Sequence, residues 1–202
     1  MLKHVSWKLP LAILFGITTI HANSQIAPSA QKGNFPLVLG GGISDFSLDY
    51  GLGRRMEGIT AWADWRFTSL PGRLRGLGIE AEGRDLNLNR PTTLPKMRQD
   101  TGQGGLTYTL RTFHNLSPYA KMLGGIGSID FPDSHNPLYT HDTFSIFSPG
   151  GGAEYRIWSR VWVRGDYEYQ FWHQTFGPHD LNPNGVTIGA TYHFGYAPGE
   201  TR

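Results

Sequence analysis

The sequence predicts an all-β fold, an eight-stranded antiparallel up-and-down transmembrane β-barrel. The first observation is a period-two alternation of apolar and polar residues, clearest in VWVRGDYEYQFW at 161–172. The second is that this alternation returns in eight segments along the chain. The third is that most connections between the segments alternate between short and long, which suits hairpins that open alternately at the two ends of one barrel.

Composition favours short strands joined by turns. The 202 residues include 27 glycines and 13 prolines, 13% are aromatic, 17% are charged, and runs that would form helices are scarce. A hydrophobic fraction of 39% is enough to build one domain of moderate size. The chain has no cysteine, which excludes a disulfide framework and a thiolate site.

The chain divides into four expected parts. Residues 1–24 have the features of a cleaved signal peptide, with basic Lys3 and Lys8, an apolar run too short to span a bilayer, and small residues before Gln25. A polar leader at 25–35, a barrel at 36–195 and a tail at 196–202 follow. The signal peptide predicts an exported protein. Its removal takes away the two lysines and lowers the net charge from +2 to 0, so we expect no nucleic-acid partner.

Each of the eight segments has an apolar face and a polar face. The first is the least regular, because Gly40, Gly41 and Gly42 blur its phase and suggest a bulge. Glycines in the wall are also expected to allow tight curvature or close contact with an aromatic ring. The segments span residues 37–50, 59–67, 77–84, 101–111, 117–127, 153–157, 161–172 and 185–194.

The connections predict which kind of barrel this is. The short ones are TSLPGR, TFHNLS and WSR. The long ones are DLNLNRPTTLPKMRQ, IDFPDSHNPLYTHDT and HQTFGPHDLNPN, which are rich in Pro, Asn and Asp. Short turns at one rim and long loops at the other are typical of barrels of the bacterial outer membrane.

The charges on the polar faces indicate the orientation of the strands. In a soluble sandwich or lipocalin-like barrel these charges would face water and would usually be rich in Lys, whereas this chain uses mainly Arg. In a membrane barrel the apolar face meets lipid, and the charges must pair inside a narrow lumen. Eight strands leave an interior that side chains fill, so we expect a plugged lumen. The expected ion-pair network comprises Asp64, Arg66, Glu80, Glu82, Arg84, Arg111, Lys121, Glu154, Arg156, Arg164, Asp166 and Glu168.

Aromatic residues near strand ends or on the apolar faces support the membrane orientation. Rings with a polar edge favour the lipid headgroup region. The expected set comprises Tyr155, Trp158, Tyr167, Tyr169, Phe171, Trp172, Tyr192 and Phe194.

Three stretches carry a resemblance to a known family. SPYAKMLGGIG, VRGDYEYQFW and NGVTIGATYHFG resemble the fifth, seventh and eighth strands of the small outer-membrane barrels related to the transmembrane domain of outer membrane protein A and to outer membrane protein X. The resemblance covers roughly residues 36–195. It implies insertion by the barrel-assembly machinery, which would read a terminal aromatic signal at Tyr192 and Phe194, although this chain continues through GYAPGETR.

No pattern in the sequence indicates a metal, a cofactor or catalysis. His135 and His141 lie near acids in one long loop and His173 and His179 in another, but their spacing matches no compact zinc motif. His193 lies on the lumen phase with no Ser beside it, so no nucleophile and base are placed together. We therefore expect no enzyme activity, no metal and no cofactor.

A group of cations is expected near the rim that carries the long loops. Such residues could bind phosphates of lipopolysaccharide, because Arg pairs with phosphate through two hydrogen bonds. The candidates are Arg54, Arg55, Arg84, Arg90, Lys96 and Arg98.

The expected function is that of a monomeric outer-membrane barrel with a structural or surface-interaction role through its external loops, in contact with outer-membrane lipid. The alternatives are a narrow porin-like channel, a lipid-modifying enzyme and a soluble lipocalin-like binding protein.

Overall fold

A computed structural model describes residues 36–48, 55–67, 69–89, 97–110, 112–132, 139–176 and 179–195. These residues belong to one compact unit, Asn34–Arg202. The expected signal peptide at 1–24, the leader at 25–35 and the tail at 196–202 lie outside the described residues.

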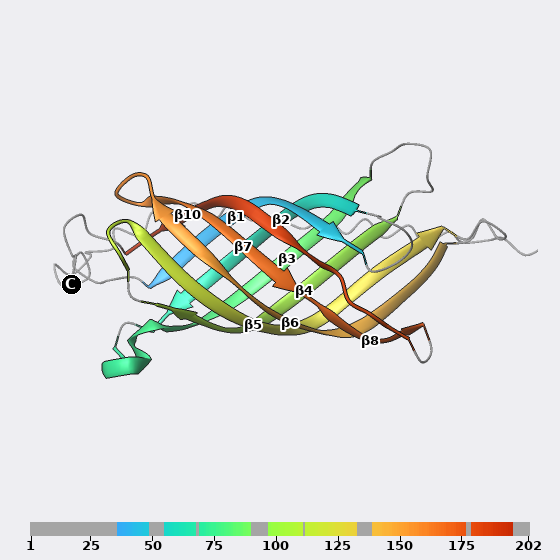
Figure 1. The fold of residues 1–202 in the computed structure, drawn as a ribbon, viewed down its shortest axis with the longest axis horizontal. Helices are drawn as coiled ribbons and strands as arrows, with labels where there is room; N and C mark the ends of the chain where they lie inside the picture. The colour runs from blue at the N-terminus through green and yellow to red at the C-terminus, as the bar shows by residue number, and fades with distance from the viewer. Residues whose placement is uncertain are drawn as a thin grey trace, which may run out of the picture. The chain divides into compact units, whose positions relative to one another are not determined.

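The described chain forms one closed antiparallel sheet (Figure 1). Its neighbours run in the order β5-β4-β3-β2-β1-β10-β7-β6, and the pairing of β5 with β6 closes the ring. A 3-10 helix, η2 (Gly72–Gly76), lies in the connection between β2 and β3. The strands are β1 (Leu37–Ser47), β2 (Arg55–Arg66), β3 (Leu77–Asn89), β4 (Arg98–Thr109), β5 (Leu116–Pro132), β6 (Tyr139–Arg156), β7 (Val161–Tyr169), β8 (Phe171–Phe176), β9 (His179–Leu181) and β10 (Asn184–His193).

The ten strand segments form eight strands of the barrel, because two of those eight are each interrupted. β7 and β8 are separated by Gln170, and both pair with β6, so β8 continues the strand that β7 begins. β9 continues into β10 across Asn182 and Pro183, and β8 pairs with β9 as β7 pairs with β10. The backbone N–H of Gln170 donates to the carbonyl of Pro183 at 2.7 Å, which joins the two interruptions. The predicted eight-stranded up-and-down barrel is confirmed.

Pairing extends further into the long connections than the sequence pattern predicts. β3 reaches Asn89, β5 reaches Pro132, and the last long connection is largely the β8–β9 hairpin. The alternation of side chains fades there, but the backbone ladder needs only N–H and C=O groups and therefore continues. We refer to this end of the barrel as the loop end, and to the other, with the connections after β2, β4 and β6, as the turn end.

Two local expectations are wrong. β1 pairs with both β2 and β10 without a register shift, so Gly40, Gly41 and Gly42 form no bulge. Gly40 instead makes room inside the barrel, because a Cβ there would overlap the indole of Trp62. Trp172 was expected among the lipid-facing aromatics, but it is fully buried in the interior. It shares the inward phase of Gln170, two residues before it.

The apolar faces of the strands point outward. Tyr167 is 48% exposed and Ile188 is 64% exposed, whereas Arg164 between β6 and β10 is 1% exposed. Ile43 pairs with Ile188 on one side and with Ile59 on the other, so three exposed isoleucines form a row across adjacent strands. This orientation excludes the lipocalin-like alternative, in which the apolar faces would point inward. No helix among the described residues is long and apolar enough to cross a membrane.

Candidate functional site: the barrel interior

The interior is lined by the polar phase of the strands. From Trp162 on β7 to Gln170 just after it, every second residue is buried, because side chains on a strand alternate between its two faces. An eight-stranded barrel is narrow enough for these side chains to meet across it. The structure brings ten of the predicted residues into ion pairs there: Asp64, Arg66, Glu80, Glu82, Arg84, Lys121, Glu154, Arg164, Asp166 and Glu168.

Lys121 on β5 is surrounded by carboxylates. Its Nζ lies 2.7 Å from Glu82 and 2.9 Å from Glu168. Asp166 and Glu80 each have an oxygen at 3.6 Å. These four acids come from β3 and β7, so one ammonium group links three strands of the wall. A buried ammonium needs such partners, because an isolated charge is expensive to remove from water.

Arg84 forms a second centre, closer to the loop end. Its Nη1 donates to Glu168 at 2.9 Å and its Nη2 donates to Glu82 at 2.6 Å. Its guanidinium carbon lies 4.2 Å from the centroid of the Phe46 ring. A planar guanidinium can use its edge for two carboxylates and its face for a ring at the same time, which an ammonium cannot do.

Arg164 forms a third centre, towards the turn end. Its Nη2 donates to Glu80 at 2.9 Å, its Nε donates to Asp166 at 2.9 Å, and its Nη1 donates to Asp64 at 3.3 Å. The Trp62 and Tyr119 rings each have their centroid 4.6 Å from its guanidinium carbon. The Tyr119 hydroxyl also donates to Asp166 at 2.6 Å. Neither aromatic residue was part of the predicted network.

The network ends near the turns. Arg66 Nη2 lies 2.6 Å from Glu154 Oε2, and His193 Nε2 lies 3.6 Å from the same oxygen. His193 also stacks on Trp162, with ring centroids 4.8 Å apart. A cavity of about 10 Å³ lies beside these groups, which is about the space of one water molecule. Its lining includes Asp64, Arg66, Glu80, Thr107, Thr109, Tyr119, Glu154 and Arg164.

The predicted network contains six acids and six cations, but the ion pairs in the described interior do not contain equal numbers of the two. Six carboxylates and four cations pair there. Arg156 is half-buried and forms no ion pair with a residue that the structure describes. Arg111, the remaining predicted cation, lies outside the described residues.

An apolar cluster fills the interior at the loop end, where the sequence pattern predicts no site. These side chains lie on the inward faces of the strands. The same faces carry charged residues further along, so the polarity of a residue alone does not show that it points inward. The period-two phase could have found Trp172, which follows Gln170 on the inward face. The cluster comprises Phe46, Leu48, Met56, Leu86, Met97, Ile129, Ile146, Trp172 and Leu181.

Glutamines connect the apolar cluster to the ions. Trp172 Nε1 donates to Gln170 Oε1 at 2.9 Å, and Gln170 Nε2 donates to Glu168 at 2.7 Å. Gln99 and Gln103 complete this layer, with Gln103 donating to Glu168 at 3.1 Å and Gln99 to Gln170 at 3.2 Å. A neutral amide can accept from the indole and donate to the carboxylate, so it links two regions of different polarity.

The expected lipopolysaccharide contacts divide into three groups. Arg84 is wrong for this role, because it is buried in the interior. Arg55 and Arg98 are exposed on the outer face near the loop end, and both are paired with acids: Arg55 with Asp45 at 2.9 Å, and Arg98 with Asp100 at 3.0 Å. Arg54, Arg90 and Lys96 lie outside the described residues.

The two aromatic residues of the expected assembly signal lie together at the turn end. Tyr192 and Phe194 are 39% and 43% exposed, and their ring centroids are 4.9 Å apart. The backbone N–H of Phe194 donates to the carbonyl of Leu37 at 3.1 Å. The last strand therefore continues to pair with the first one as far as this aromatic residue.

The described residues contain no group of three or more acids, histidines or cysteines that could hold a metal. His173 is exposed on β8. The side chains of His135, His141 and His179 lie outside the part of the chain whose side chains are described.

A comparison with protein families shows the family of the chain. The model of the outer membrane protein beta-barrel domain matches residues 11–194. The chain belongs to this family. It is therefore a protein of the bacterial outer membrane, as the strand pattern and the orientation of the apolar faces indicate. A search of the curated proteins finds no match.

Solved structures of two small outer-membrane barrels share the fold of this family member. Neisserial surface protein A is 11% identical, with a TM-score of 0.60, over 79% of this chain and 97% of that one. Ail, the attachment invasion locus protein of Yersinia pestis, is 13% identical, with a TM-score of 0.55, over 77% of this chain and 96% of that one. At these identities the likeness concerns the fold alone.

Proposed function

We propose that this chain is a closed, non-conducting barrel that acts as a structural or surface-interaction protein of the outer membrane. In this proposal the lumen is plugged by side chains, the long loops face the outside and carry the interactions, and the short turns face the periplasm. The barrel works as a monomer, without a cofactor and without catalysing a reaction.

The filled interior is the single observation that carries the proposal. An ionic network occupies the middle and the turn end, and an apolar cluster occupies the loop end. A permeating ion would have to displace Trp172 and its neighbours, which are fully buried, and then break charge-assisted hydrogen bonds. On this proposal the two layers together close the lumen to ions.

The chemistry of the network supports a structural role. The buried ions that could act as acids or bases, such as Glu168 and Asp166, are held by Lys121 and by guanidinium groups. Acids that pair with neighbouring cations in a filled interior have no place for a substrate.

Lipopolysaccharide and the assembly machinery are proposed partners. Arg55 and Arg98 lie on the outer face near the loop end, where a phosphate could compete with the paired acids Asp45 and Asp100. The exposed Phe194 at the end of the last strand would be accessible to the machinery that inserts the barrel.

Planar-bilayer conductance tests the proposal. The wild-type barrel should give no stable channel. A double variant that truncates one side chain in the apolar cluster and one in the ionic network, Trp172→Ala with Arg84→Ala, should conduct if it folds. Heat-modifiable migration on gels shows whether each protein is folded. Stable conductance of the folded wild type would instead support the runner-up, a narrow channel, in which the excess of carboxylates among the described interior residues would favour cations.

Loop-deletion variants test the surface role. Replacing residues 133–138 by a short Gly-Ser connection should abolish binding of the folded barrel to cells or envelope components without changing its thermal stability. Binding that is unaffected by shortening this loop and the loop at 90–96 would remove the external loops as the interaction surface.

A further inference from the structure

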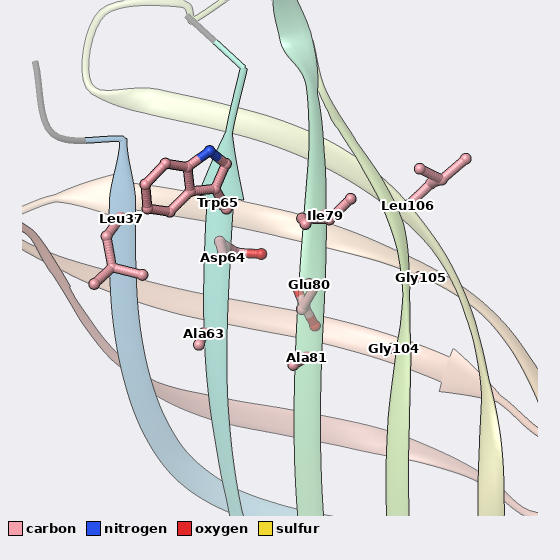
Figure 2. A pocket seen from close by; sticks show the side chains of 10 residues that line it. All are labelled: Leu37, Ala63, Asp64, Trp65, Ile79, Glu80, Ala81, Gly104, Gly105 and Leu106. Atoms are coloured by element: carbon pink, nitrogen blue, oxygen red, sulfur yellow. The ribbon is translucent and has the colours of Figure 1, made fainter.

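The outer wall of the barrel has an apolar groove over β1 to β4, in the half nearer the turns (Figure 2). It has a volume of about 460 Å³. The side chains of Asp64 and Glu80 in its lining point to the interior, so only their backbone contributes to the outer surface. The lining comprises Leu37, Ala63, Asp64, Trp65, Ile79, Glu80, Ala81, Gly104, Gly105 and Leu106.

Strand register creates the groove. Four large outward residues lie side by side on adjacent strands, since Trp65 pairs with Leu37 and Ile79, and Ile79 pairs with Leu106. The next outward row is small, because Ala81 pairs with Ala63 and with Gly104. A wall of large side chains therefore stands beside a floor of small ones, as Figure 2 shows for Trp65, Ile79 and Ala81.

A positively charged turn lies beyond the row of large side chains, in the connection between β2 and β3. η2 connects β2 and β3, the two strands that form the floor, and it carries Arg73 and Arg75. Both arginines are exposed, and neither forms an ion pair with an acid that the structure describes. Arg75 precedes Ile79 by only four residues, a reach of at most about 14 Å along extended chain. The backbone of Arg75 therefore lies within this reach of the groove's lining.

The turn is held in this position. The hydroxyl of Tyr108 on β4 donates to the carbonyl of Arg73 at 2.6 Å. Gly76 lies so close to β4 that a Cβ on it would overlap the carbonyl of Thr109. Leu74, between the two arginines, is 53% exposed and can enter the lipid. The groove and the cations are thus parts of one anchored surface.

We propose that this surface binds one glycerophospholipid with an anionic phosphate headgroup, in the leaflet that the turns face. One acyl chain lies in the groove on Ala63, Ala81 and Gly104, and the phosphate pairs with Arg73 and Arg75. Apolar lining selects the acyl chain, and two uncompensated guanidinium groups select the phosphate. The site goes beyond the proposed function and holds whether or not the lumen conducts.

Native mass spectrometry of the full mature chain, released from nanodiscs that contain phosphatidylglycerol and phosphatidylethanolamine, tests the site. The wild type should retain one phosphatidylglycerol. Ala81→Leu fills the floor and should lower the retained fraction about tenfold, a difference of about 1.4 kcal/mol. Ala63→Leu serves as a second variant. Ala120→Leu, which enlarges an exposed alanine on β5, is the matched control and should retain the lipid.

The charge is tested separately. Arg73→Gln with Arg75→Gln should retain phosphatidylglycerol no better than a diacylglycerol with the same chains, whereas Arg160→Gln in the β6–β7 turn should behave as the wild type. Equal retention by the folded wild type and both groove variants would overturn the site. A wild-type dimer that Ala81→Leu converts to a monomer would assign the groove to a second copy of the chain and would also overturn it. Retention unaffected by the arginine changes would overturn the headgroup assignment.

Discussion

The Nζ of Lys121 lies 2.9 Å from Glu168 Oε2, and neither side chain is exposed to solvent. The two residues belong to β5 and β7, which are not adjacent, so this contact crosses the interior and braces the barrel against deformation.

Removing the charge of Lys121 should therefore destabilise the barrel strongly. Lys121→Met keeps most of the volume but leaves Glu82, Glu168 and their neighbours without this cation, which should cost about 3–5 kcal/mol. Urea unfolding of the protein in lipid vesicles measures the change. Met122→Leu, at the adjacent lipid-facing position, is the control and should change stability by less than about 1.5 kcal/mol. Equal effects of the two changes would show that Lys121 is not buried among acids.

A double-mutant cycle tests the pair at the turn end. The Nη2 of Arg66 lies 2.6 Å from Oε2 of Glu154, and the glutamate side chain is fully buried. Arg66→Met and Glu154→Gln should each destabilise the barrel, and the double variant should recover part of the loss, with a coupling energy of about 1–3 kcal/mol. Additive effects, measured by the same unfolding experiment, would mean that the two side chains do not interact in the membrane.

Glycines facing inward and outward should respond differently to the same substitution. A Cβ on Gly127 would overlap the Trp172 indole, whereas nothing lies within 4 Å of a Cβ placed on Gly102. Gly127→Ala should therefore destabilise the barrel by about 1–3 kcal/mol through overpacking. Gly102→Ala should be near neutral. Urea unfolding in lipid vesicles measures both changes. A costlier change at Gly102 than at Gly127 would contradict the position of the apolar cluster.

The row of isoleucines predicts which part of the barrel lies near the midplane of the bilayer. Ile43 is 67% exposed and lies between Ile59 and Ile188. Ile43→Arg should cost about 2–4 kcal/mol in unfolding experiments in vesicles, as expected for a charge on the lipid face near the midplane. Leu74→Arg, in the turn, should cost much less. The opposite order would place Ile43 outside the membrane.

The phase of the strands could be predicted from sequence, but the contacts across the lumen could not. The alternation in VWVRGDYEYQFW correctly assigns Arg164, Asp166 and Glu168 to one face and Tyr167 to the other, because a strand has only two faces. Which arginine meets which acid depends on strand tilt and stagger. Arg84 and Glu168 are far apart in sequence, and no local pattern connects them.

The apolar cluster shows a different limit of the pattern. Inward positions near the loop end carry Phe46, Leu86 and Trp172, so the polar phase of each strand becomes apolar along its length. A prediction based on the alternation of polar and apolar residues therefore ends the strand too early, because backbone pairing continues beyond that point. For the same reason Trp172 looked like a lipid-facing ring, although it is two residues from the inward Gln170.

Labelling of single cysteines tests the orientation and the closed interior together, since the natural chain has no cysteine. Thr187, on β10, is 2% exposed inside the barrel, and its neighbour Ile188 is 64% exposed outside. In intact vesicles, a cysteine at Thr187 (Thr187→Cys) should resist a charged, water-soluble thiosulfonate added to both sides. Ile188→Cys should react with an apolar maleimide dissolved in the bilayer. Rapid modification of Thr187→Cys by the water-soluble reagent, or a reversed preference for the lipid-dissolved one, would contradict a filled lumen and outward-facing apolar residues.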